Sequence, residues 1–153
     1  MISIGTKVPD FQLKDQNGVV HTASDLRGKN VLLSFHPLAW TGVCQRQMEA
    51  LEMNAAVFGE LNAIAYGISV DSTPCKKAWA ESMNVKTTPL LADFWPHGGL
   101  AQALGVFREA EGVSERANVI VDGEGLIRWI KVYPLSEVPN LEEVIQVLRN
   151  LDL

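Results

Sequence analysis

The sequence has only two cysteines, fewer basic than acidic residues, and no apolar run as long as a membrane-spanning helix. Two cysteines are too few for a disulfide scaffold. The 13 Lys and Arg residues against 18 Asp and Glu argue against a nucleic-acid-binding protein. A membrane helix needs about 20 apolar residues, and the first residues lack the pattern of a signal peptide. We therefore expect a cytoplasmic protein with no nucleic-acid or membrane partner.

What is present is an ordinary globular composition, with 153 residues of which 47% are hydrophobic. Because no repeat, linker or low-complexity segment divides the chain, we predict a single domain over residues 1–153. In a reducing cytoplasm, a cysteine with a role is more often reactive than structural. A free cysteine is also often a small buried apolar residue, so composition leaves both interpretations open for Cys44 and Cys75.

Two hydrophobic periods alternate along the chain and predict its strands and helices. Nearly continuous apolar runs predict strands, of which the last two flank an Asp-Gly-Glu-Gly turn and predict a hairpin. These runs are 31–35, 64–70, 118–121 and 126–132. Spacings of three and four predict helices. The helical segments are about four turns after Thr41, then 74–83, 98–104 and the segment that follows Asn140.

Local signals refine these elements and point to a fold class. Ser72 and its neighbours are candidate caps for the helix at 74–83, and Asn140 with Glu143 predicts a capping box. Residues 15–18 predict the turn of a small N-terminal hairpin. The alternation predicts an α/β protein with a central mixed sheet flanked by helices. With its N-terminal extension, this arrangement resembles a thioredoxin-like fold.

Cys44 stands between the first buried strand and the helix after Thr41. Ligands of open α/β sheets bind outside the carboxyl ends of the strands. Unpaired N–H groups and the helix dipole stabilise a thiolate in the first turn of a helix. Thioredoxin-type oxidoreductases have Trp-Cys-x-x-Cys at this corner, whereas Trp40–Cys44 reads Trp-Thr-Gly-Val-Cys and excludes a local dithiol ring. A single thiolate beside a hydroxyl suits a small electrophile that hydrogen bonds orient.

The pattern Pro-x-x-x-Thr-x-x-Cys, formed by Pro37, Thr41 and Cys44, resembles the active-site motif of the peroxiredoxins, the AhpC/TSA family. The resemblance extends over nearly the whole chain. Other segments that carry it are 8–11, 69–72, 91–98 and Arg116 before the strand at 118–121. The segment 91–98 is similar to the one-cysteine, alkyl hydroperoxide reductase E-like branch.

The resemblance implies a thiol-dependent peroxidase with an antioxidant role that reduces hydrogen peroxide and organic hydroperoxides through a Cys44 sulfenic acid. It implies that Thr41 binds the peroxide and that Arg116 stabilises the thiolate and the developing negative charge. Pro37 shields the site, and amides near Val43 add donors. No metal and no cofactor is implied.

Each of these residues also has a plainer interpretation. Thr41 is a candidate helix N-cap, and Pro37 is a candidate loop proline. Arg116 is a candidate for a surface ion pair with Glu115 or Asp122. Gln47 departs from the family, which commonly has glutamate three residues after the cysteine, so we expect the hydrogen bond to remain without the charge.

Cys75 is the candidate resolving cysteine, which would form a Cys44–Cys75 disulfide. Its place at a helix start beside Lys76 and Lys77 predicts a favoured thiolate. A dithiol reductant such as thioredoxin would then reduce the disulfide. The alternative is a spectator cysteine, with Cys44 reduced by an external thiol, a small thiol or a glutaredoxin-like protein. His36 and His97 lack the spacing that would make the cysteines a metal site.

Trp40, Phe94 and Trp95 form an aromatic set in loops, which predicts either core packing or the interface of a homodimer. Two other functions compete with the peroxidase. One is a thioredoxin-like thiol–disulfide oxidoreductase. Ala117 argues against it, because such a protein would have a proline at this strand entry after Arg116. The other is a peroxide-sensing redox switch that turns over poorly.

Overall fold

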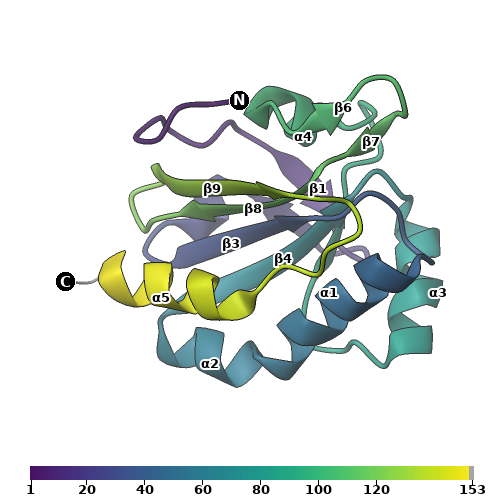
Figure 1. Ribbon diagram of the computed structural model, residues 1–153, viewed down its shortest axis with the longest axis horizontal. Coiled ribbons are helices and arrows are strands. Elements are labelled where there is room, and N and C mark those ends of the chain that lie inside the picture. Colours follow the sequence, from purple (N-terminus) through teal and green to yellow (C-terminus); the bar gives the residue numbers. More distant parts are fainter. Residues whose placement is uncertain (152–153) are drawn as a thin grey trace.

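The computed structural model describes residues 1–151 and has a five-stranded mixed sheet at its centre (Figure 1). Its strands are β3 (Asn30–Phe35), β4 (Ala63–Ser69), β5 (Leu90–Ala92), β8 (Arg116–Val121) and β9 (Ile127–Tyr133). Their order is β5-β4-β3-β8-β9. The first three are parallel, β8 is antiparallel to β3, and β9 is antiparallel to β8. The predicted sheet with an antiparallel hairpin at its edge is confirmed.

Helices cover both faces of this sheet and bury two hydrophobic clusters. The helices are α1 (Gly42–Met53), α2 (Ala55–Glu60), α3 (Thr73–Met83), α4 (Gly99–Leu104) and α5 (Leu141–Leu151). Figure 1 shows α4 with the N-terminal segment on one side and α1, α2 and α5 on the other. Leu100 and Leu104 belong to the first cluster, and Met48, Phe58 and Val144 to the second. None of the helices within residues 1–151 has the length and apolar character that a membrane crossing requires.

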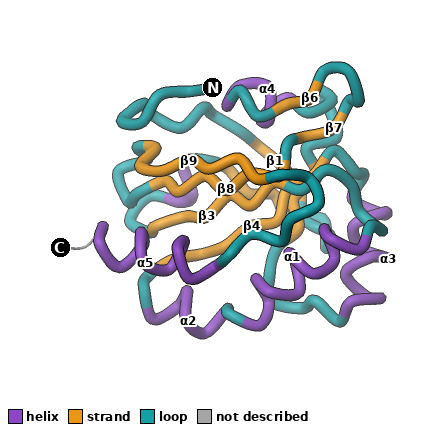
Figure 2. Tube along the Cα trace, in the orientation of Figure 1, coloured by secondary structure: helices purple, strands orange, loops and turns teal. Residues whose placement is uncertain are grey.

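Smaller elements lie outside the central sheet (Figure 2). The predicted N-terminal hairpin is present as β1 (Gln12–Lys14) and β2 (Val20–Thr22), followed by a 3-10 turn, η1 (Ser24–Leu26). The Asp15 carboxylate accepts the N–H groups of Asn17 and Val19 and so closes the hairpin turn. A second pair, β6 (Phe107–Arg108) and β7 (Val113–Ser114), was not predicted because two residues show no periodicity.

The prediction of one four-turn helix after Thr41 is wrong in one respect, because the chain divides it at Asn54 into α1 and α2. The Asn54 side chain donates to the Ala50 carbonyl at 2.8 Å. Asparagine side chains compete in this way with the helical backbone. The apolar spacing continues across the break because both helices pack on the same cluster.

Two helix starts test the predicted caps. Ser72 Oγ accepts the Cys75 N–H and caps α3 as predicted. Asn140 Oδ1 accepts the Glu142 N–H at the start of α5. Glu143 does not complete a capping box, because its carboxylate binds the Tyr133 hydroxyl and the Lys131 ammonium on β9. Contacts with β9 have thus replaced the predicted bond between Glu143 and the start of its own helix.

Candidate active site

Cys44 lies where the sequence placed it, in the first turn of α1 beyond the carboxyl end of β3. Its side chain is 1% exposed and packs in the apolar cluster beneath α1. The parallel strands β3, β4 and β5 end at this same edge, so the loops that follow them lie on the same side of the sheet as the cysteine. The thiol is therefore enclosed, and the groups that touch it decide its chemistry.

Arg116 is the cation that touches Cys44. It begins β8, whose next residue, Ala117, pairs with Phe35 at the end of β3. Its Nη1 lies 3.3 Å from Cys44 Sγ. The side chain is buried, and its Nε and Nη2 both donate to the Leu135 carbonyl, at 3.1 and 2.8 Å. The guanidinium is thus held on two sides while one nitrogen faces the sulfur.

The alternative of a surface ion pair for Arg116 is excluded by the same geometry. Glu115 binds Arg108 at 2.7 Å, and Asp122 binds Arg128 at 3.0 Å. Arg116 instead donates to Gln47 Oε1 at 2.7 Å. The expectation for Gln47 is confirmed, since the hydrogen bond is present without a carboxylate charge.

Gln47 opens a buried polar chain that the sequence did not reveal. Its Nε2 donates to Ser34 Oγ at 2.8 Å, and Ser34 donates to Asn118 Oδ1 at 2.7 Å. Asn118 Nδ2 donates to the Tyr133 hydroxyl, which in turn donates to Glu143. Ser34 and Asn118 are polar residues inside otherwise apolar strands, and that contrast is the signal that could have identified them. Fully satisfied buried networks rigidify the groups that they join.

The loop between β3 and α1 carries Pro37 and Thr41. Pro37 is half-buried and directly follows His36 at the end of the strand. The Thr41 hydroxyl is exposed and donates to the Leu38 carbonyl at 2.8 Å. Thr41 occupies the N-cap position of α1 with an extended backbone, but its side chain makes no capping bond. The plain N-cap role predicted as an alternative for its side chain is therefore wrong.

Asp71, which follows β4, fastens this loop to the neighbouring strand. Its Oδ2 accepts the Ala39 N–H at 2.8 Å and the Ser69 hydroxyl at 2.6 Å. Trp40, the next residue of the loop, has a left-handed backbone with φ of 67°. Non-glycine residues adopt this conformation only where the surroundings enforce it. The carboxylate therefore helps to hold the turn that leads into Thr41 and Cys44.

Cys75 is half-buried in the first turn of α3 and packs against the same apolar cluster as Cys44. Its Sγ lies 3.8 Å from Asp71 Oδ1. Burial and the Asp71 carboxylate raise the pKa of Cys75, against smaller opposing effects of Trp40 and Lys76. The prediction that its helix start and the adjacent lysines favour the thiolate is wrong in sign. Lys77 is exposed, and Asp71 is the charge that faces the sulfur.

The aromatic set lies on the surface. Trp40, Phe94 and Trp95 are 56%, 52% and 80% exposed. The core-packing interpretation of these side chains is therefore wrong, and the interface interpretation stays a prediction. All three follow strands that end at the active-site edge, Trp40 after β3 and the other two after β5.

The two histidines that were candidate metal ligands, His36 and His97, have other contacts. His97 lies 2.6 Å from the Gly112 carbonyl, far along the chain from the cysteines. His36 is buried, and its Nε2 lies 3.1 Å from the Lys76 ammonium. Within residues 1–151, no three His, Cys, Asp or Glu side chains gather as a metal site would need.

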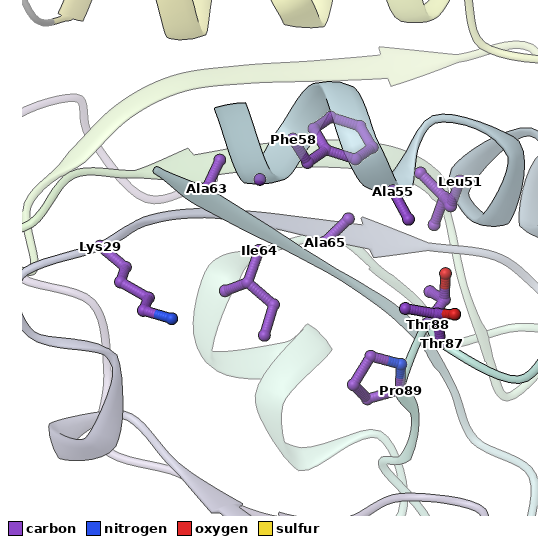
Figure 3. Close-up of a pocket in the computed structure, with 11 residues that line it drawn as sticks. Lys29, Leu51, Ala55, Phe58, Ala63, Ile64, Ala65, Thr87, Thr88 and Pro89 are labelled. Atoms are coloured by element: carbon purple, nitrogen blue, oxygen red, sulfur yellow. The ribbon is translucent and has the colours of Figure 1, made fainter. Parts of the chain in front are cut away.

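A cavity of about 200 Å³ lies elsewhere, between α2, β4 and the residues before β5 (Figure 3). Its lining is mostly apolar and includes Leu51, Phe58, Ala65, Thr88 and Pro89. Neither a cysteine nor Arg116 lines it. The cavity is therefore separate from the site around Cys44.

Comparisons with known proteins agree with this geometry. The model of the AhpC/TSA family matches residues 4–130. Alkyl hydroperoxide reductase E of Mycobacterium tuberculosis is 43% identical over 139 residues, 90% of each chain. A peroxiredoxin of Pyrococcus furiosus is 31% identical over 160 residues, 100% of this chain and 73% of the relative. The crystal structure of Enterococcus faecalis AhpC gives a TM-score of 0.91 at 32% identity, over 99% and 93% of the chains. The predicted thioredoxin-like fold is confirmed.

Proposed function

Since this chain belongs to the AhpC/TSA family and is a thiol-dependent peroxidase, we propose that Cys44 is its peroxide-reducing nucleophile. Members of the family act on peroxides with thiol reductants. The observation that carries the proposal is the contact between the buried Cys44 sulfur and the Arg116 guanidinium, at 3.3 Å. A neighbouring cation favours a thiolate, which is the nucleophilic form.

The reaction transfers one oxygen atom. The Cys44 thiolate attacks the terminal oxygen of the peroxide, so that an S–O bond forms and the O–O bond breaks. Sulfur is oxidised by two electrons to the sulfenic acid. The remaining oxygen leaves as hydroxide or alkoxide and takes a proton to become water or an alcohol. We propose hydrogen peroxide and organic hydroperoxides as substrates.

Three residues support this step in the proposal. Arg116 balances the charge of the thiolate and of the leaving oxygen. The exposed Thr41 hydroxyl exchanges its bond to the Leu38 carbonyl for one to the peroxide, which orients the O–O bond. Pro37, half-buried at the mouth of the loop, restricts access of water to the sulfenic acid.

Cys75 is the candidate resolving residue, because it is the second of only two cysteines and packs on the same cluster as Cys44. Its thiolate would attack the Cys44 sulfenic acid, so that an S–S bond forms and the S–O bond breaks; the hydroxide that leaves takes a proton and becomes water. Because burial and Asp71 raise the pKa of Cys75, we expect disulfide formation to accelerate as the pH rises. An external thiol, such as thioredoxin, a glutaredoxin-like protein or a small thiol, then completes the cycle.

The test is intact mass under non-reducing conditions after one equivalent of hydrogen peroxide. We expect wild type to lose two hydrogens within one chain, Cys75→Ser to gain one oxygen, and Cys44→Ser to stay unchanged. Peroxide consumption should fall by about a thousandfold or more in Cys44→Ser, because the nucleophile is lost.

Each other outcome has a definite meaning. If wild type and Cys75→Ser both gain one oxygen, Cys75 is a spectator and the enzyme depends on an external thiol. If Cys44→Ser reacts like wild type, the assignment of the nucleophile is wrong. Reduction of insulin disulfides without peroxide consumption would indicate a thioredoxin-like oxidoreductase instead. Oxidation without turnover by any reductant would indicate a redox switch.

A further inference from the structure

Lys76 is a fully buried lysine at the centre of the polar groups behind the active-site loop. It is 0% exposed, although it lies on α3 beside the exposed Lys77. Its Nζ donates to Ser69 Oγ at 2.6 Å and lies 3.1 Å from His36 Nε2. Lysine is almost never buried without partners. The amine therefore needs an explanation beyond packing.

The contacts of Lys76 lead directly to the loop that carries the reaction. Ser69, which accepts from Lys76, donates to Asp71, and Asp71 accepts the Ala39 N–H. On the other side, His36 ends the segment from β3 and precedes Pro37. One amine thus joins the strand end before the loop to the carboxylate that holds the middle of it.

The charges around Lys76 come from every neighbouring element. Cys44, Cys75, Asp71 and Asp93 attract its ammonium, from α1, α3 and the segments after β4 and β5. Burial, with the positive charges of Lys76 and Arg116, lowers the pKa of His36 well below its ordinary value. Burial and these two cations therefore favour the neutral imidazole, whose Nε2 lies beside the amine.

We infer that Lys76 is a positioning residue of the peroxidase site, which holds the Ser69–Asp71–Ala39 connection and supplies a second positive charge to the Cys44 thiolate. The inference rests on the proposed role of Cys44. Arg116 contacts the sulfur from β8, and Lys76 acts from α3 through the loop. Two cations on different elements then share one thiolate.

This role has a pH signature. Burial lowers the pKa of Lys76 from 10.5 to about 7, although the four acidic groups partly oppose it. The ammonium is therefore present below about pH 7 and is lost above it. The benefit to peroxide reduction should be full at pH 6 and should decline as the pH rises through 7, opposite in sign to the ionisation of a thiol.

The test compares the rate constant of Cys44 oxidation by hydrogen peroxide in wild type and Lys76→Met between pH 6 and 8.5. We expect wild type to react about tenfold faster at pH 6 and no more than about threefold faster at pH 8.5. Lys77→Met, which removes the exposed neighbour, is the control and should follow wild type at every pH. A merely structural defect in Lys76→Met would change the ratio of the two rate constants by the same factor at every pH.

A ratio that stays near one, or that does not change with pH, would overturn the inference. If wild type itself does not react with peroxide, the proposed function fails first, which keeps the two failures apart. We expect Lys76→Met to fold, because an apolar residue of similar length replaces a buried charge.

Should Lys76→Met not fold, Ser69→Ala breaks the connection and keeps the amine. We expect Ser69→Ala to lower the rate constant of Cys44 oxidation about threefold. The benefit of the Lys76 ammonium to this rate constant should still decline above pH 7. An unchanged rate would count against the inference.

Stability supplies a second readout. A buried lysine with a lowered pKa destabilises the fold while it is protonated. The wild-type denaturation midpoint should therefore rise between about pH 7 and 10, a rise that Lys76→Met lacks. A wild-type midpoint that does not rise more than that of the variant would show that Lys76 does not titrate in this way.

Discussion

Hydrogen bonds from each nitrogen of the Arg116 guanidinium fix the position of this side chain. Nε and Nη2 share the Leu135 carbonyl, while Nη1 meets both Cys44 Sγ and Gln47 Oε1. The planar fork of arginine presents these donors together, whereas lysine offers one point charge on a flexible chain. Position, and not charge alone, is therefore what we expect the site to require.

Arg116→Lys tests this requirement. We expect kcat/KM for hydrogen peroxide to fall about a hundredfold, because the positive charge remains but is no longer held against the Cys44 sulfur. Stopped-flow measurement of peroxide reduction provides the value. Arg128→Lys, in an exposed ion pair with Asp122, is the matched control. A loss of less than about threefold in Arg116→Lys would mean that charge alone suffices.

At the scale of elements, Glu52 near the end of α1 fastens the segment that leads into β5. Its carboxylate accepts the N–H groups of Lys86, Thr87 and Thr88 and the Thr88 hydroxyl. Burial alone would raise its pKa, but these hydrogen bonds lower the pKa of Glu52 to about 2. One side chain thus ties the helix that carries Cys44 to the edge strand of the sheet.

Glu52→Gln should lower the free energy of unfolding by about 1 kcal/mol at pH 7, since an amide offers one acceptor oxygen and no charge. The pKa of Glu52 is lowered, so its stabilisation is present above about pH 4.5 and is lost toward pH 2. Urea unfolding at pH 7 and pH 3 should show the difference shrinking. Glu60→Gln, exposed on α2, is the control, and an equal effect at both pH values would refute the electrostatic account.

At the scale of the whole molecule, the large aromatic side chains exposed at the active-site edge are unusual for a solvent-exposed protein surface. Aromatic residues are enriched in the buried centres of interfaces. We propose that a second copy of this chain covers Trp40, Phe94 and Trp95 in a homodimer.

Trp95→Glu tests the dimer. Burying a charge where a tryptophan packs should raise the dimer dissociation constant by about thirtyfold or more. Sedimentation at several concentrations measures the change. Met53→Glu alters an apolar side chain that is 84% exposed on α1 and should leave the constant unchanged. A wild type that sediments as a monomer, or a Trp95→Glu that dimerises equally well, would contradict the proposal.

The sequence by itself determined most of the longer elements and the place of Cys44 at the start of a helix, because these features depend on local rules. Apolar periods placed the strands of the sheet, and Ser72 and Asn140 marked two helix starts. The motif of Pro37, Thr41 and Cys44, which resembles that of the peroxiredoxins, singled out Cys44 as the candidate nucleophile beyond the end of β3. Such features involve residues within a few positions of each other, where composition and pattern carry enough information.

Only the tertiary structure decided how the site is charged. Arg116 reaches Cys44 across 72 positions because β8 pairs with β3. Burial and the Asp71 carboxylate, and not the adjacent lysines, decide that the pKa of Cys75 is raised. The same packing buries Lys76 beside His36. Electrostatic effects depend on burial and on distances between remote segments, and neither quantity is a property of a local pattern.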